Sequence, residues 1–212
     1  MKERIKNFLR PLVPKILLKS LKKLSDKKLI DDWKKNGCPI PPPHIVKQLI
    51  IAEYQQKYGH SILLETGTYM GTMVEAQKSN FNKIISIELG IDLFEKAQKR
   101  FENDKNITIV QGDSGKVLGL LLKDISEPII FWLDGHYSAG TTALGDKECP
   151  IFEELDAIFD SKQFNHVILI DDAREFVGNG DYPSIEKLTD YIKNKNDKYQ
   201  VEVKDDIIRY AI

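Results

Sequence analysis

The segment from Ile62 to Gly71 constrains the fold of this chain more than any other stretch. An apolar run ends at Glu65 and leads through Gly67 into what is predicted to be the start of a helix. This pattern is typical of a buried parallel strand that feeds a nucleotide-binding loop. Gly67 permits the tight turn, and Gly71 allows the helix to pack close to the strand.

Tyr69 stands where the dinucleotide-binding pattern G-x-G-x-x-G has its middle glycine. That glycine lets the backbone approach a pyrophosphate. A ligand that contains adenosine but no pyrophosphate does not need it, and S-adenosylmethionine is such a ligand. A strand–helix turn of this kind can also be purely structural, so the assignment depends on the strand ends that follow.

The composition indicates one α/β domain with a full core and an N-terminal extension, because 42% of the 212 residues are hydrophobic. The net charge of -1 provides no global field that would recruit nucleic acid. The two cysteines, Cys38 and Cys149, lack metal-ligand spacing and are expected to be reduced thiols. No apolar run reaches the length of a membrane span, and we expect a cytoplasmic protein.

Residues 1–28 are basic, and their apolar residues recur at helical spacing, broken by Pro11 and Pro14. One interpretation is an amphipathic segment that lies on an anionic membrane surface, at the inner face of the membrane. The preferred interpretation is a pair of helices that packs on the domain or on a second subunit of a homo-oligomer. Residues 33–43 end in three successive prolines, which predict an irregular linker. We therefore divide the chain into an extension, 1–43, and a domain, 44–212.

After a predicted helix at 44–58, apolar runs alternate with helical patterns through the rest of the chain. The runs are 61–65, 84–88, 107–111, 129–133 and 167–171, and the helices are 72–80, 91–103, 114–123, 151–160 and 184–194. This alternation predicts a parallel sheet with helices on both faces. The segments 199–203 and 207–212 are expected to form a closing hairpin.

Five parallel strands, a helix and a hairpin whose last strand runs antiparallel resemble the class I S-adenosylmethionine-dependent methyltransferase fold. The resemblance implies an α/β, doubly wound, mostly parallel sheet of seven strands with a Rossmann-like arrangement. Ligands of such sheets lie beyond the carboxyl ends of the strands, where the strand order reverses. The ends of the predicted strands are therefore where functional residues are expected.

Acidic residues follow the first three strands. Glu88 ends the second, about twenty residues after the glycine loop, where an acid can accept both ribose hydroxyls of an adenosine. Asp113, after the third, is placed to meet the adenine amino group, and Ser114 is a candidate helix cap. The alternative for each acid is a helix cap or a solvated loop. The resemblance implies a cofactor site, and we predict that it contains Glu65, Gly67, Thr68, Tyr69, Gly71, Glu88, Asp113, Ser114 and Asp134.

Three further carboxylates follow the fourth and fifth strands, at Asp134, Asp171 and Asp172. Because these strands are expected to be neighbours, the carboxylates should converge and repel one another unless a positive charge neutralises them. An oxygen-rich cluster suits a hard divalent cation such as Mg²⁺. The alternative is that Asp171 or Asp172 caps a helix.

His136 lies two residues after Asp134 and has a pKa suited to removing a hydroxyl proton. The motif Asp-Gly-His-Tyr followed by Asp-Asp resembles metal-dependent sugar O-methyltransferases of the macrocin O-methyltransferase type. That resemblance implies metal ligands at Asp134, Asp171 and Asp172 and a catalytic base at His136.

Two segments near these strand ends are candidate acceptor contacts. The polar stretch 138–150 is interpreted as a substrate lid with Thr141, Thr142 and Lys147 as contacts. Arg174 is placed either to pair with an anionic group of the substrate or to form a salt bridge with a loop acid.

The sequence thus predicts an S-adenosylmethionine-dependent, metal-assisted O-methyltransferase that acts on a hydroxyl of a sugar, a nucleotide sugar or a surface glycan. One alternative is an NAD-dependent nucleotide-sugar oxidoreductase, against which Tyr69 argues. Another is a non-catalytic cofactor-fold subunit of a membrane-associated synthesis complex, recruited through residues 1–28. The acidic strand ends argue against a purely structural role.

Overall fold

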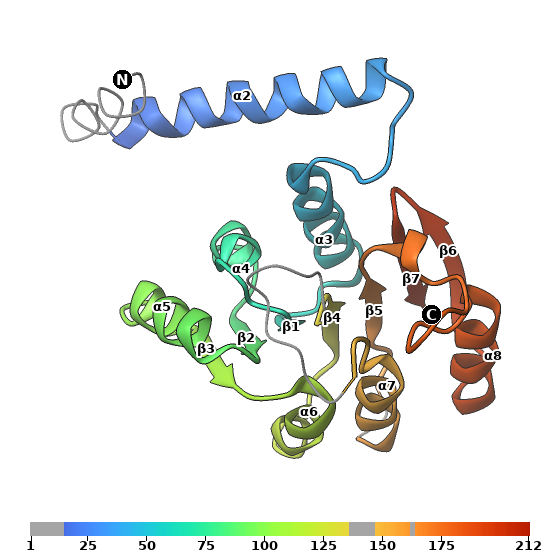
Figure 1. Ribbon diagram of the computed structural model, residues 1–212. Coiled ribbons are helices and arrows are strands. Elements are labelled where there is room, and N and C mark those ends of the chain that lie inside the picture. The colour runs from blue at the N-terminus through green and yellow to red at the C-terminus, as the bar shows by residue number, and fades with distance from the viewer. Residues whose placement is uncertain (1–14, 136–146, 162–163) are drawn as a thin grey trace. The chain divides into compact units, whose positions relative to one another are not determined.

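The computed structural model describes residues 15–135, 147–161 and 164–212. The chain separates into two compact units, Met1–Lys47 and Gln48–Ile212. The second unit contains the whole sheet and every described residue of the candidate site (Figure 1).

The first unit contains one long described helix, α2 (Lys15–Lys35), and the start of α3 (His44–Tyr58). The sequence predicted that regular structure would stop before Trp33, but α2 continues two residues past it. Trp33 is buried, and its Nε1 donates a hydrogen bond to the carbonyl of Pro39 at 2.8 Å. The helix ends where Gly37 adopts a left-handed conformation, with φ 81°, which is a common way to terminate a helix. No helix in the described part of the chain is long and apolar enough to cross a membrane.

The second unit is built on a seven-stranded sheet of order β3-β2-β1-β4-β5-β7-β6. Its strands are β1 (Ile62–Thr66), β2 (Lys83–Glu88), β3 (Ile107–Gln111), β4 (Ile129–Leu133), β5 (Val167–Ile170), β6 (Gln200–Lys204) and β7 (Ile207–Ala211). The first five strands are parallel, and β7 runs antiparallel to both β5 and β6. The predicted doubly wound sheet with a closing hairpin is confirmed.

The central parallel strands are largely apolar runs because helices cover both faces of the sheet. On one face α6 (Ser114–Leu122), α7 (Ile151–Asp160) and α8 (Ile185–Lys195) share a buried apolar cluster with the strands. Figure 1 shows α4 (Thr72–Gln77) and α5 (Ile91–Phe101) on the opposite face. Every residue of β1, β4 and β5 is buried.

The strand order reverses between β1 and β4, because β1 leads outward to β2 and β3 whereas β4 leads to β5. The crevice at such a reversal, beyond the carboxyl ends of the strands, is where open α/β sheets bind their ligands. The loops that follow β1, β4 and β5 therefore surround the candidate site.

Candidate functional site

The loop after β1 is pressed against the end of β4. Gly67 adopts φ 84°, and a Cβ atom at this position would overlap the carbonyl oxygen of Asp134. Its backbone N–H donates to the carbonyl of Ile87 at 2.9 Å, which ties the loop to β2 as well. Only glycine fits both the left-handed conformation and this close approach. Gly71 has a similar role, since a Cβ there would lie 2.7 Å from the ring of Phe101.

Glu65 is buried beneath this loop and supports it. The Oγ atom of Ser86 donates to the carboxyl of Glu65 at 2.5 Å, and the hydroxyls of Ser86 and Thr68 lie 2.6 Å apart. Burial raises the pKa of Glu65 to about 8, against the hydrogen bond from Ser86, and the carboxylates of Asp134 and Glu88 raise it further. Glu65 is 2% exposed, and its carboxyl contacts Ser86 beneath the loop. Its direct contact with a cofactor stays a prediction.

Glu88 holds the same loop from the end of β2. One carboxylate oxygen accepts the backbone N–H of Tyr69 at 2.7 Å, and the other accepts that of Gly90 at 2.8 Å. Each carboxylate oxygen has two lone pairs, so one backbone hydrogen bond does not saturate it, although Glu88 is only 5% exposed. Tyr69 itself has φ 47° and is 49% exposed. Tyr69, which stands where the dinucleotide-binding pattern has its middle glycine, thus has a left-handed backbone and a largely exposed side chain.

Asp113 and Ser114 follow β3, and Asp113 is the residue that caps α6. Its Oδ1 accepts the backbone N–H of Gly115 at 3.1 Å, and its carboxylate lies 3.4 Å from the ammonium of Lys116. The expectation that Ser114 caps this helix was wrong, because Ser114 is already the first helical residue and is buried. Asp113 thus caps α6 with Oδ1 and pairs with Lys116 through Oδ2, and its contact with an adenine stays a prediction.

The three predicted metal ligands lie at the ends of neighbouring strands. Asp171 donates its backbone N–H to the carbonyl of Leu133 at 3.0 Å, which brings the β5 end beside Asp134. The Oδ1 atom of Asp171 accepts the N–H of Asp172 at 2.8 Å, and Asp172 pairs with Arg174 at 2.9 Å. Among residues 15–135, 147–161 and 164–212, no group of three His, Cys, Asp or Glu side chains is placed to hold a metal ion. The predicted triad is therefore not assembled as a ligand set.

Two roles were predicted for Arg174, and the structure shows the second of them, a salt bridge with loop acids. The guanidinium pairs with Asp172 and with Asp206, and Nε lies 3.3 Å from Glu175. The predicted base His136 and the predicted contacts Thr141 and Thr142 lie outside the described residues.

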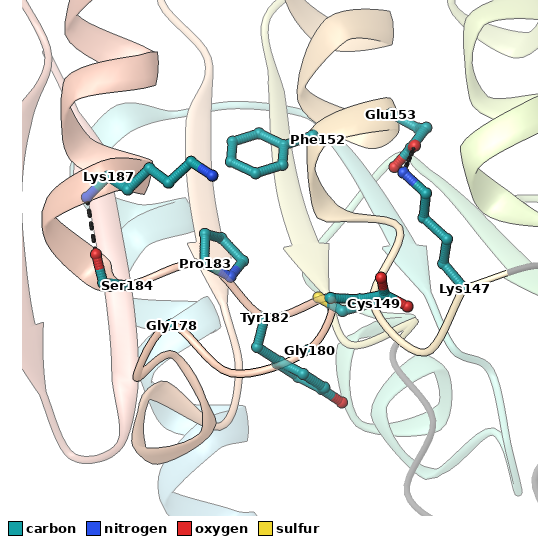
Figure 2. Close-up of a pocket in the computed structure, with 11 residues that line it drawn as sticks. Lys147, Cys149, Phe152, Glu153, Gly178, Gly180, Tyr182, Pro183, Ser184 and Lys187 are labelled. Carbon is teal, nitrogen blue, oxygen red and sulfur yellow. Dashed lines mark hydrogen bonds and ion pairs between the residues drawn. The ribbon is translucent and has the colours of Figure 1, made fainter.

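A cavity of about 290 Å³ opens between the first turns of α7 and α8, on the side of the sheet where β4 and β5 end. Figure 2 shows Lys187 extending toward the ring of Phe152, with 5.5 Å between the ammonium and the ring centre. Across the cavity, Lys147 pairs with Glu153. The lining residues are Lys147, Cys149, Phe152, Glu153, Gly178, Gly180, Asp181, Tyr182, Pro183, Ser184 and Lys187.

A smaller cavity, of about 140 Å³, lies beside the first and is lined in part by Asp113 and Gly115. The pair Lys147–Glu153 lines both cavities and separates them. One cavity therefore adjoins the predicted adenine contact, whereas the other adjoins the loops that follow β5.

Several residues of this region were not singled out from the sequence. Ser86 lies inside a strand, and Asp206 lies in a hairpin turn 32 residues from its partner Arg174. Glu154 is buried in the first turn of α7, and a Cβ at Gly135 would lie 3.1 Å from its Oε1. No spacing or motif signals these three residues, because their partners come from other elements.

The chain also contains the spacing Tyr-x-x-x-Lys that is associated with hydride chemistry, at Tyr191 and Lys195. Both residues lie on α8, and both side chains bind the carboxylate of Asp156 on α7. They occupy a helix–helix contact, and neither of them lines the cavities at the strand ends.

No family profile and no curated protein matches the sequence. Solved structures match at the level of the fold. The O-methyltransferase TomG from Streptomyces achromogenes, crystallised with S-adenosylmethionine, shares 14% identity at a TM-score of 0.60, with 88% of each chain covered. An O-methyltransferase from Bacillus cereus, crystallised with S-adenosylhomocysteine, shares 13% at a TM-score of 0.58 over 99% of this chain and 97% of that one. The Podospora anserina methyltransferase PaMTH1, also bound to S-adenosylhomocysteine, shares 14% at 0.57 over 94% and 97%.

These similarities extend over nearly the whole of each chain but involve few identical residues. They show that the chain has the fold of class I S-adenosylmethionine-dependent methyltransferases. What the chain binds and transfers has to be argued from its own site.

Proposed function

We propose that this protein is an S-adenosylmethionine-dependent O-methyltransferase. The observation that carries the proposal is the β1–α4 loop, which is held by Gly67 against β4 and by Glu88 from β2 at the point where the strand order reverses. A loop built in this way places the carboxylate of Glu88 at the carboxyl ends of the strands, where it can accept hydrogen bonds from a ribose. Of the similar solved structures, TomG was crystallised with S-adenosylmethionine and the Bacillus cereus enzyme with S-adenosylhomocysteine.

The described residues fit the cofactor. The two oxygens of Glu88 each accept one backbone hydrogen bond, which does not saturate them, and Asp113 borders a cavity of about 140 Å³ on the adenine side. The bound cofactor would supply a methyl group already activated on a sulfonium. The protein then has to orient an acceptor hydroxyl and remove its proton, and alignment alone contributes much of the rate.

In this proposal the acceptor enters the larger cavity and is a hydroxyl of a sugar, a nucleotide sugar or a surface glycan. Two cations, Lys147 and Lys187, and two carboxylates, Glu153 and Asp181, line that cavity, so its charge is balanced. Charged donors and acceptors that line one cavity together with an apolar ring, Phe152, suit a polyhydroxylated ligand. The base in this proposal is His136, which follows Asp134 by two residues in the sequence.

Two measurements test the proposal. Calorimetric titration should give saturable binding of S-adenosylhomocysteine and none of NADH, and the reverse preference would favour the oxidoreductase. A screen that detects S-adenosylhomocysteine release in the presence of single sugars and nucleotide sugars should then identify an acceptor. If the protein binds the cofactor but releases no S-adenosylhomocysteine with any of these sugars, a sugar acceptor is rejected and the methyltransferase assignment still stands.

A further inference from the structure

Most of helix α2 is open to solvent. Of residues 20–35, Trp33 is buried, Asp26 and Ile30 are partly covered, and all the others are exposed. These three residues are spaced by four and three, so they lie on one stripe along the helix. Most of the stability of a helix in a protein comes from the packing of an apolar face, so a helix with one narrow covered stripe is expected to have a further partner.

Two neighbouring leucines lie on the side of α2 opposite to that stripe. Leu21 and Leu24 are 52% and 65% exposed, and residues three apart in a helix are adjacent on its surface. The helical repeat places this pair on the far side of the helix from Asp26 and Ile30. Large apolar side chains that lie together on an otherwise polar surface indicate a contact with another molecule.

The helix is strongly basic, although the chain as a whole is not. α2 contains eight lysines and three aspartates, which give it a net charge of +5, whereas the whole chain has a net charge of -1. Lys27 and Lys28 are exposed and lie three and four residues after Leu24, so they flank it on the surface. Because the rest of the chain is net acidic, an anionic surface would attract α2 and repel the remainder, which orients the protein before contact.

An anionic lipid surface fits both features of α2 better than other partners do. Nucleic acid would attract the lysines but offers no apolar layer to the leucines, and a second α2 would bring two net positive helices together. An anionic bilayer provides headgroups for the ammonium groups and, just beneath them, an acyl boundary for the leucines. The described helices, α2 included, are not long and apolar enough to cross a membrane, so α2 would lie on its surface.

We propose that α2 docks the protein on an anionic lipid bilayer, with Leu21 and Leu24 at the boundary between headgroups and acyl chains. The lysines stay at the level of the headgroups, because their long stems let the ammonium groups reach water. This proposal replaces the packed helix pair that the sequence favours for residues 1–28, because every residue of 20–32 except Asp26 and Ile30 is exposed. The inference goes beyond the proposed methyltransferase activity and does not rest on it.

The first experiment is flotation of the full-length wild-type protein with two kinds of vesicle, phosphatidylcholine alone and an equimolar mixture of phosphatidylcholine and phosphatidylglycerol. We expect the protein to float with the anionic vesicles only, and to float less at high salt, where charges are screened. A protein that floats with neither kind of vesicle, or equally with both, would overturn the proposal. Because the wild type is measured directly, this result does not depend on how a variant folds.

The second experiment locates the apolar contact. A variant that combines Leu21→Ser with Leu24→Ser should bind the anionic vesicles at least about tenfold more weakly, because both leucines lose their apolar burial. The control Leu120→Ser replaces a leucine that is 62% exposed on α6, and its binding should equal that of the wild type. Equal binding by the double variant and the control would contradict the proposal.

The third experiment tests the charge. A variant that combines Lys27→Gln with Lys28→Gln should bind more weakly than one that combines Lys96→Gln with Lys99→Gln, which removes the same charge from exposed positions on α5. Binding that is lost in the lysine variant but kept in the leucine variant would indicate a purely electrostatic surface, such as one for nucleic acid. If the leucine variant instead converts a dimer into a monomer in light scattering, without a change in vesicle binding, a second copy covers this face. Either result would overturn the proposal.

Discussion

Replacing Glu65 by Gln is expected to stabilise the protein by an amount that grows with pH. The carboxyl of Glu65 is fully buried, and its pKa is raised from 4.5 to about 8. In the unfolded chain the group ionises at its ordinary pKa, whereas in the folded chain it keeps its proton up to about pH 8. Between these values the folded state binds one more proton, so the stability of the wild type falls as pH rises.

The size of the effect follows from the shift. Each pH unit in this window lowers the unfolding free energy of the wild type by about 1.4 kcal/mol relative to a chain without the titrating group. Glutamine keeps an acceptor for the hydroxyl of Ser86, which donates to Glu65 at 2.5 Å. Glu65→Gln should therefore match the wild type near pH 5 and exceed it by about 4 kcal/mol near pH 8, after which the difference becomes constant.

The assay is denaturant unfolding of both proteins at a series of pH values, with unfolding free energies extrapolated to water. The control is Glu95→Gln, a glutamate exposed on α5, for which the difference from wild type should not change with pH. If the unfolding free energies of wild type and Glu65→Gln change in parallel between about pH 5 and pH 8, Glu65 ionises at its ordinary pKa. Its carboxyl would then not be buried beneath the loop as described.

Three further substitutions, one of them with a matched control, test the loop and the base. Glu88→Ala should weaken binding of S-adenosylhomocysteine by about 1.5–3 kcal/mol for each charge-assisted ribose bond lost, as measured by calorimetry, and unchanged affinity would remove Glu88 from the cofactor site. Gly67→Ala should lose cofactor affinity and about 1–3 kcal/mol of stability, since its Cβ would overlap the carbonyl of Asp134. Gly59→Ala, which is also left-handed but has no atom within 4 Å of the new Cβ, should lose stability alone, and equal losses in both variants would contradict the close-approach argument. His136→Ala should lower turnover by about 10²–10⁴-fold while cofactor affinity stays near that of the wild type, and full turnover would place the base elsewhere.

The sheet was predictable because its central parallel strands are buried on both faces and are therefore largely apolar runs, while β3, which has no buried residue, is still mostly apolar. The run 129–133 coincides with β4, and 107–111 coincides with β3. The left-handed turn at Gly67 was likewise visible, since only one residue type suits it. The end of α2 was misplaced because the packing of Trp33 against Pro39 extends the helix, and local propensity does not contain that contact.

The positions of the acids at the strand ends were predictable, but their partners were not. A strand-end aspartate can bind a ligand, cap a helix or pair with a basic residue, and the sequence does not distinguish these roles. Asp113 turned out to cap α6, and Asp172 to pair with Arg174. The partner Asp206 is contributed by the hairpin turn, and Lys187 reaches the larger cavity from α8, so both depend on how distant segments pack.

The most direct test of the cofactor site is a crystal structure of the protein grown with S-adenosylhomocysteine. We predict that the ribose hydroxyls lie within hydrogen-bonding distance of the Glu88 carboxylate, with the loop at Gly67 in contact with the ligand at the β1–β4 reversal. A ligand bound elsewhere, or one whose ribose makes no contact with Glu88, would contradict it.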